Sequence, residues 1–201
     1  MQRIILASQS LRRKQLLEWA EVPFMVLTAN SEELIPANTP VEEVPIVIAR
    51  EKAEVVRSKV SNFSEGRDIK EITMPVLAAD TIVVLDNEII GKPINRQHAL
   101  EILKRISGRK HIVITGVVIH HNDKEVAFSV STEVEFHDLD TKQIEYYVDN
   151  YEPFDKAGAY AIQEWIGVVG VKSVNGDFYN VMGLPISRVI YELNKLEKEN
   201  E

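Results

Sequence analysis

The stretch Val76-Leu77-Ala78-Ala79-Asp80-Thr81-Ile82-Val83-Val84-Leu85 gives the clearest strand signal of the chain and decides the fold. Its length and its β-branched residues are typical of a buried strand. The dipeptide Asp86-Asn87 follows it and predicts a tight turn into a second strand at Glu88-Ile89-Ile90. The sheet that contains this strand is therefore expected to include antiparallel pairs.

Upstream of this hairpin, the sequence predicts two further strands and two helices. The strands are expected at residues 4–7 and 23–28, and the helices at residues 11–20 and 41–60. Ser10 is the expected N-cap of the first helix. Residues 61–73 are rich in charge and are expected to form a loop.

Downstream of the hairpin, helices alternate with two further hairpins. The helices are expected at residues 98–106, 141–150 and 185–196, with Asn95 and Thr141 as N-caps of the first two. The hairpins are expected at residues 111–136, around Asn122-Asp123, and at residues 168–181, around Asn175-Gly176-Asp177. Because helices alternate with strands and tight turns join several strands, we predict an α/β fold with a mixed sheet flanked by helices.

Composition limits the classes of function. The chain has 201 residues, 45% of them hydrophobic, which predicts a single globular domain over residues 1–201. It has no cysteine, so thiol catalysis and zinc–thiolate sites are excluded. A net charge of −8 disfavours a polynucleotide partner but leaves room for a small basic site. No apolar run is long enough for a membrane span or a signal peptide, which predicts a cytoplasmic protein.

The first candidate site is Ser8-Gln9-Ser10-Leu11-Arg12-Arg13, where a strand turns into a helix. Arg12 and Arg13 lie in the first helical turn, where positive charge is unfavourable unless an anion is bound. Free N–H groups, hydroxyls and guanidinium groups together form a good phosphate cradle. The alternative is a capped surface helix with solvated arginines.

The second candidate is Asp80, a carboxylate inside a strand that is otherwise apolar. An unpaired buried charge is costly, so Asp80 must be paired, bound to a metal or neutralised. Such a group is suited to act as a general base or a magnesium ligand. The alternative is a structural ion pair with a helix or a loop.

Two weaker motifs lie further along the chain. In Gly91-Lys92-Pro93 a lysine is held in a stiff turn, and a turn with an incidental lysine is the alternative interpretation. In the segment 155–163 small residues precede Gln163, whose amide could recognise the edge of a base. A tight loop with a surface glutamine is the alternative there.

In combination these motifs resemble the Maf (septum-formation) family of nucleoside triphosphate pyrophosphatases, over nearly the whole chain. The matching motifs are Ser8-x-Ser10-x-Arg12-Arg13, Glu51-Lys52-Ala53, Ala79-Asp80-Thr81, Gly91-Lys92-Pro93, Asp155-Lys156-Ala157-Gly158 and Gly183-Leu184-Pro185. The resemblance implies an elongated Maf/ITPase-like fold with a substrate cleft between two lobes. It also implies hydrolysis of a nucleoside triphosphate to the monophosphate and pyrophosphate with Mg²⁺ or Mn²⁺.

The resemblance also implies roles for individual residues. Asp80, Lys92 and Lys52 form the implied catalytic set, with Asp80 as the base. Asp80 and Glu33 are the implied metal ligands, with Glu32 as the alternative to Glu33. The implied substrate-binding residues are Ser8, Ser10, Arg12, Arg13, Thr81 and Gln163.

Within the family, Tyr160-Ala161-Ile162-Gln163 and Gly183-Leu184-Pro185-Ile186 resemble the branch that acts on dTTP, UTP and modified pyrimidine triphosphates. Glu164 departs from this branch, which has glycine after the glutamine. Two alternatives remain: a pyrophosphatase for purine lesions such as dITP or XTP, and a non-enzymatic nucleotide sensor that regulates septum formation. The resemblance further implies a possible homodimer.

Overall fold

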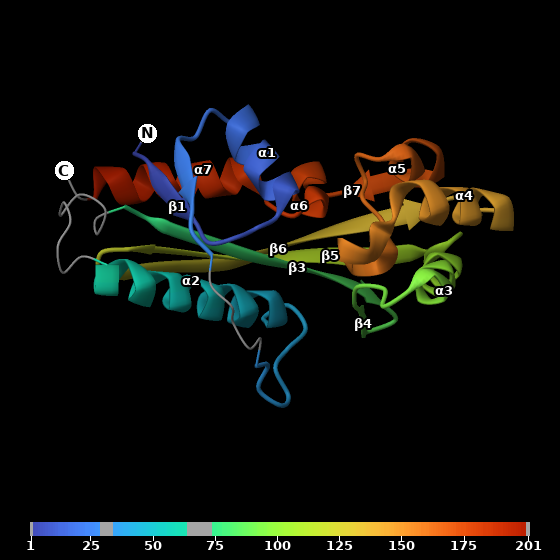
Figure 1. Cartoon of the computed structure of the whole chain (residues 1–201), viewed down its shortest axis with the longest axis horizontal. Helices are drawn as coiled ribbons and strands as arrows, with labels where there is room; N and C mark the ends of the chain where they lie inside the picture. The colour runs from blue at the N-terminus through green and yellow to red at the C-terminus, as the bar shows by residue number, and fades with distance from the viewer. Residues whose placement is uncertain (1, 29–33, 64–73, 200–201) are drawn as a thin grey trace. The chain divides into compact units, whose positions relative to one another are not determined.

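The computed structural model describes residues 2–28, 34–63 and 74–199 (Figure 1). Strands and helices alternate in the first part, and helices and short 3-10 turns dominate between β6 and the C-terminal helix. The elements in chain order are β1 (Ile4–Leu6), α1 (Leu11–Trp19), β2 (Phe24–Val26), α2 (Val44–Phe63), β3 (Val76–Leu85), β4 (Glu88–Ile90), α3 (Arg96–Ile106), β5 (Lys110–His121), β6 (Lys124–Phe136), α4 (Thr141–Tyr151), η2 (Pro153–Asp155), η3 (Ala157–Ala159), α5 (Trp165–Gly170), β7 (Val171–Asn175), α6 (Phe178–Met182) and α7 (Ile186–Lys198).

The described strands form one seven-stranded mixed sheet. Its order is β2-β1-β3-β5-β6-β7, and β4 pairs with β3 beside this path. β1 is parallel to both β2 and β3, whereas β3–β4 and β6–β7 are antiparallel. The turn residues Asp86 and Asn87 both have positive φ, as the tight turn between β3 and β4 requires. The predicted mixed α/β sheet is confirmed.

The chain divides into two compact units. Unit 1 comprises Met1–Asp80, Thr115–Ser129 and Gly183–Glu201, and unit 2 comprises Thr81–Ile114 and Val130–Met182. A single domain over residues 1–201 stays a prediction.

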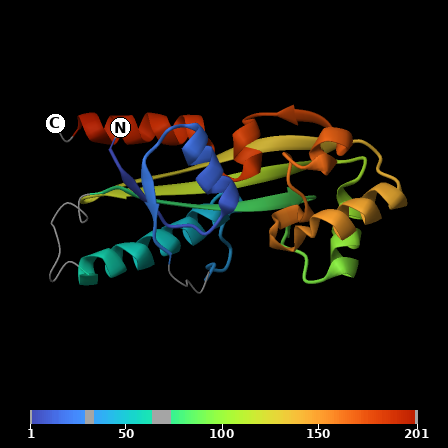
Figure 2. The same cartoon turned by 45° about the horizontal axis from the view of Figure 1, so that its top comes forward.

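In unit 1, α2 covers one face of the strands, and α1 and α7 lie on the other face (Figures 1 and 2). Ala49, Ala53 and Val56 of α2 pack against buried strand residues: Ile5, Ala7, Val76, Ala78 and Val118. The start of α2 lies so close to β5 that a Cβ on Gly116 would come within 2.3 Å of the backbone of Pro45 and Ile46. Small residues therefore set the distance between this helix and the sheet.

In unit 2, α3 and α4 pack against each other, and α3 also contacts the short turns η2 and η3. The faces that they bury are apolar: Ala99, Leu100, Ile102, Leu103 and Ile106 in α3, and Ile144, Tyr147 and Val148 in α4. Asn95 caps α3 as predicted, because its side chain accepts a hydrogen bond from the His98 N–H at 2.9 Å.

Three predictions about local structure are wrong. Residues 165–170 and 178–182 form helices, so residues 168–181 do not form a hairpin, and β7 pairs with β6 instead. Asp140, not Thr141, caps α4, because its carboxylate accepts the Gln143 N–H at 2.8 Å and Gln143 bonds back to the Asp140 N–H. Residues 61–63 continue α2 instead of starting a loop, and residues 64–73 lie outside the described part.

Among the described residues, no helix is both long and apolar enough to span a membrane.

Candidate functional site

The turn between β1 and α1 is closed by its own serine hydroxyls. Ser8 is only 8% exposed, and its Oγ accepts the Ser10 N–H at 3.2 Å. The predicted cap of α1 is confirmed, since the Ser10 Oγ accepts the Arg13 N–H at 3.4 Å. The two hydroxyls therefore satisfy two backbone N–H groups of the turn and help to define its shape.

Arg13 ties this turn to the start of the C-terminal segment. Its Nη1 donates to the Ser8 Oγ at 3.2 Å, and its Nε donates to the Gly183 carbonyl at 2.8 Å. Burial lowers the pKa of the Arg13 guanidinium from its usual value; Asp80 opposes this effect, and Arg12 adds to it. Among the sequence-predicted residues, Arg13 thus lies close enough to both Asp80 and Arg12 to interact with each of them electrostatically.

Asp80 and Lys52 lie close together because of the spacing of residues along the strand β3 and along the helix α2. Val76, Ala78 and Asp80 alternate along β3, so they point to the face that α2 covers. Lys52 lies in the same helix as Ala49, which is buried on that face. The Lys52 Nζ donates to the Asp80 Oδ1 at 2.7 Å, and the side chains are 21% and 19% exposed. A partly buried, reachable ion pair results.

Asp80 and Thr81 interrupt the burial of β3. The four residues before them and the four after them are buried, whereas these two are partly exposed. Thr81 is the first residue of unit 2. The two polar residues in the middle of this strand are therefore also the two that solvent can reach.

One further contact next to Lys52 was not predicted from the sequence. The Leu34 N–H donates to the Glu51 carboxylate at 3.3 Å, which joins Leu34 to α2. The predicted metal ligand Glu33 and its alternative Glu32 both lie outside the described residues.

The chemistry of Asp80 fits a hard divalent cation. Mg²⁺ is usually bound by one or two carboxylates together with substrate phosphates and water. Asp80 is partly exposed, and its Oδ1 is the oxygen that bonds to Lys52. Within the described ranges, no group of three or more His, Cys, Asp or Glu side chains forms a metal cluster.

In unit 2, two of the predicted motifs lie in contact. The Gly158 N–H donates to the Gly91 carbonyl at 3.2 Å, which joins the turn of Lys92 to the segment 155–163. Gly158 has a φ of +70°, and a Cβ there would come within 2.9 Å of Val83. Glycine is therefore required at this contact. The Lys92 side chain is exposed on its turn.

Gln163 lies at the exposed end of a buried segment. Tyr160, Ala161 and Ile162 are buried, whereas Gln163 is exposed. The Glu164 N–H donates to the Ala161 carbonyl at 3.1 Å, which closes a turn with Gln163 at its tip. This placement suits a side chain that contacts a ligand.

Lys156, Glu164 and Tyr147 form a polar cluster under this turn that the sequence did not reveal. Lys156 is 7% exposed, and its ammonium lies 2.7 Å from Asp155 and 3.6 Å from Glu164. The Tyr147 hydroxyl donates to Glu164 and accepts the Ala161 N–H at 3.1 Å. The available signal was a lysine placed directly before the small residues Ala157-Gly158-Ala159.

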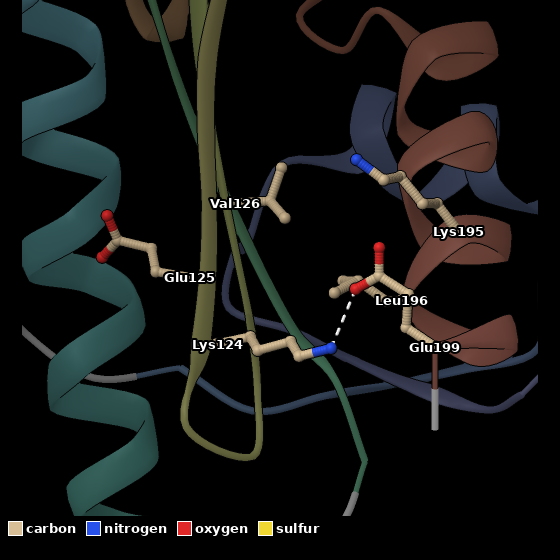
Figure 3. Close-up of a pocket in the computed structure, with 6 residues that line it drawn as sticks. All are labelled: Lys124, Glu125, Val126, Lys195, Leu196 and Glu199. Carbon is tan, nitrogen blue, oxygen red and sulfur yellow. Dashed lines mark hydrogen bonds and ion pairs between the residues drawn. The ribbon is translucent and has the colours of Figure 1, made fainter. Parts of the chain in front are cut away.

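A surface hollow elsewhere in unit 1 shares no residue with these groups. It is lined by Lys124, Glu125, Val126, Lys195, Leu196 and Glu199 (Figure 3). Lys124 and Glu199 form an ion pair across it at 2.8 Å. The Glu125 carboxylate points toward α2, where it pairs with Arg50 at 2.9 Å. Chemistry is therefore better placed at Asp80 than in this hollow.

Known proteins match the chain over nearly its full length. The sequence model of the family described as Maf-like protein matches residues 3–196. The dTTP/UTP pyrophosphatase of Cytophaga hutchinsonii is 46% identical, over 96% of this chain and 84% of that protein. The dTTP/UTP pyrophosphatase of Bacteroides thetaiotaomicron is 45% identical, over 96% of this chain and 95% of that protein. The dTTP/UTP pyrophosphatase of Porphyromonas gingivalis is 42% identical, over 98% of this chain and 96% of that protein.

Among solved structures, the Staphylococcus aureus Ham1 protein matches 67% of this chain and 71% of its own, with 13% identity and a TM-score of 0.41. A likeness at that level does not support a family assignment, which rests on the sequence comparisons. Since the family model spans residues 3–196 and the relatives are 42–46% identical over almost the whole chain, this protein belongs to the Maf family.

Proposed function

We propose that this protein is a nucleoside triphosphate pyrophosphatase that hydrolyses dTTP and UTP to the monophosphate and pyrophosphate. The observation that supports this most directly is the Lys52–Asp80 pair within electrostatic reach of Arg13. The names of the relatives that are 42–46% identical support the substrates.

The groups of unit 1 suit attack by water on a phosphoanhydride. Asp80 is the proposed base: its carboxylate orients and deprotonates the water. Lys52 donates to one of its oxygens, which holds the carboxylate in one orientation. Ser8, Ser10, Arg12 and Arg13 lie at the N-terminus of α1, where positive potential stabilises phosphate charge.

The proposed metal ligands are Asp80 and Glu33. A divalent cation held there would neutralise charge on the triphosphate. We expect chelation by EDTA to abolish pyrophosphate release and added Mg²⁺ or Mn²⁺ to restore it. Full activity in EDTA would remove the metal from the proposal.

The remaining predicted residues receive roles on the substrate. We propose that Lys92 binds a phosphate, because its ammonium is exposed on a stiff turn. Gln163 is proposed to recognise the edge of the base, because its amide can both donate and accept. Thr81 is proposed to contribute to the choice of substrate.

The test is a panel of canonical and modified triphosphates with Mg²⁺, followed by chromatographic analysis of the phosphate products. Release of pyrophosphate from dTTP and UTP is the expected result. Release of single phosphates would contradict the proposal. Hydrolysis confined to dITP and XTP would favour the purine-lesion alternative, and binding without turnover would favour a sensor.

A homodimer and a cytoplasmic location stay predictions. Light scattering of the purified chain tests the first, and fluorescence microscopy of a tagged chain tests the second.

A further inference from the structure

The turn that presents Gln163 is tied to α4 at both of its ends. At one end, the Ala161 N–H donates to the Tyr147 hydroxyl at 3.1 Å. At the other end, the Glu164 carboxylate accepts a hydrogen bond from the same hydroxyl. The Glu164 N–H closes the turn on the Ala161 carbonyl at 3.1 Å. One hydroxyl of a fully buried tyrosine therefore holds both ends of the Gln163 turn.

The Glu164 carboxylate is itself fixed by charge. Its second oxygen lies 3.6 Å from the Lys156 ammonium, which is nearly buried. The other acidic partner of Lys156, Asp155, has a side chain that is 70% exposed. A buried ammonium with one exposed partner needs a second anion nearby, because water cannot solvate it fully. Lys156 therefore holds the Glu164 carboxylate in place, and this carboxylate in turn balances the positive charge of Lys156.

The backbone of Glu164 starts the next element. Its carbonyl accepts the Gly167 N–H at 2.9 Å and the Val168 N–H at 3.3 Å, in the first turn of α5. Gln163 is thus followed directly by a residue that is held through its side chain, its N–H and its carbonyl. A side chain on so constrained a backbone has little backbone freedom to lose when a ligand binds.

We propose that Glu164 is a positioning residue for base recognition: through Tyr147 and Lys156 it fixes the turn that aims Gln163 at the base of the nucleotide. This inference rests on the proposed function, because it assigns Gln163 to the base. It predicts that loss of the Glu164 contacts changes which bases are accepted more than it changes the chemical step.

The decisive variant is Tyr147→Phe, which removes a single oxygen atom and keeps the aromatic packing. Because the turn that carries Gln163 loses the hydroxyl that holds both of its ends, we expect the KM for dTTP and UTP to rise roughly tenfold, which is about 1.4 kcal/mol of lost binding. The kcat should stay within about threefold, since the variant removes binding that is equal in the ground and transition states. The preference for dTTP over dCTP and dITP should fall. Glu164→Ala should act in the same direction, and Glu164→Gln should lie between it and the wild type.

A double variant separates positioning from stability. If Glu164 acts through Gln163, then Glu164→Ala should not change the base ranking further in a Gln163→Ala background. The matched control is Glu133→Ala, which removes a carboxylate from a surface ion pair with Lys110 in the same unit. We expect this control to retain the wild-type KM and ranking.

The outcomes distinguish the two proposals. A wild type that releases no pyrophosphate from any triphosphate overturns the proposed function and this inference with it. An active wild type whose ranking is unchanged in Tyr147→Phe and Glu164→Ala overturns the inference alone. Additive effects of Glu164→Ala and Gln163→Ala on the ranking would also overturn it, because they would show that Glu164 acts independently.

Discussion

His111 should make the stability of the protein depend on pH in mildly acidic solution. Its side chain is 2% exposed and lies among the rings of Phe136 and Tyr160. The Nε2 atom is 2.7 Å from the Tyr160 hydroxyl, and Nδ1 is buried without a hydrogen-bond partner in the described structure. Burial lowers the pKa of His111 from 6.5 to about 4.

The sign and size of the effect follow from proton linkage. Between these two pKa values the unfolded chain binds a proton at His111 and the folded chain does not, so acid favours unfolding. The stabilisation is complete above pH 6.5 and is lost progressively toward pH 4. Linkage gives a loss of about 2 kcal/mol between about pH 7.5 and about pH 5 from this one group.

The measurement is urea unfolding at these two pH values for the wild type and for His111→Gln. Glutamine can still bond to the Tyr160 hydroxyl but does not titrate. Between the two pH values, the free energy of unfolding of His111→Gln should therefore fall by about 2 kcal/mol less than that of the wild type. The window stops at pH 5 because carboxylates titrate below it; hydrogen bonds from Arg50, for example, lower the pKa of Glu125. His137→Gln, at an exposed position, is the control and should behave as the wild type. An equal fall in His111→Gln and the wild type would refute the reasoning.

Three further substitutions test the site. Asp80→Asn should reduce pyrophosphate release by about a hundredfold or more, because it removes the general base, while the melting temperature changes little. Asp86→Asn, which removes a surface carboxylate paired with Arg109, is its control, and near-normal activity of Asp80→Asn would exclude Asp80 from catalysis. Gln163→Ala should change the order of preferred bases in steady-state assays more than the maximal rate, and a uniform loss for every base would argue against its role. Arg13→Lys should lower the free energy of unfolding in urea by about 1–2 kcal/mol, since an ammonium cannot reproduce the two directed bonds to Ser8 and Gly183; unchanged stability would show that these bonds are dispensable.

The sequence predicted correctly those elements that depend on residues close together in the chain. The strand at residues 76–85, its Asp86-Asn87 turn and the caps Ser10 and Asn95 follow from periodicity and local hydrogen-bonding chemistry. The hairpin predicted at residues 168–181 is wrong, although β7 (Val171–Asn175) overlaps its first strand, because β-branched residues around Asn175-Gly176-Asp177 resemble a hairpin. The strand β7 pairs instead with β6, and this pairing between segments far apart in the sequence cannot be read from a local pattern.

The sequence predicted which residues form the candidate site. It did not predict the ion pairs and hydrogen bonds between them. The cost of a charge inside an apolar strand singled out Asp80, and the structure supplies its partner Lys52 through the register of α2 on the sheet. The contacts of the Tyr147–Glu164–Lys156 cluster were not predictable, because its members come from separate elements and their contacts depend on how these elements pack. The metal ligand Glu33 lies outside the described residues and stays a prediction.

The bond between Arg13 and Gly183 joins residues that are 170 positions apart. During synthesis the N-terminal turn can form its serine hydrogen bonds early, because they span only a few residues. The guanidinium of Arg13 gains its carbonyl partner only after Gly183 has been synthesised. A nascent or truncated chain that stops before Gly183 therefore lacks this contact, and its N-terminal turn is held only by the local bonds of the two serines.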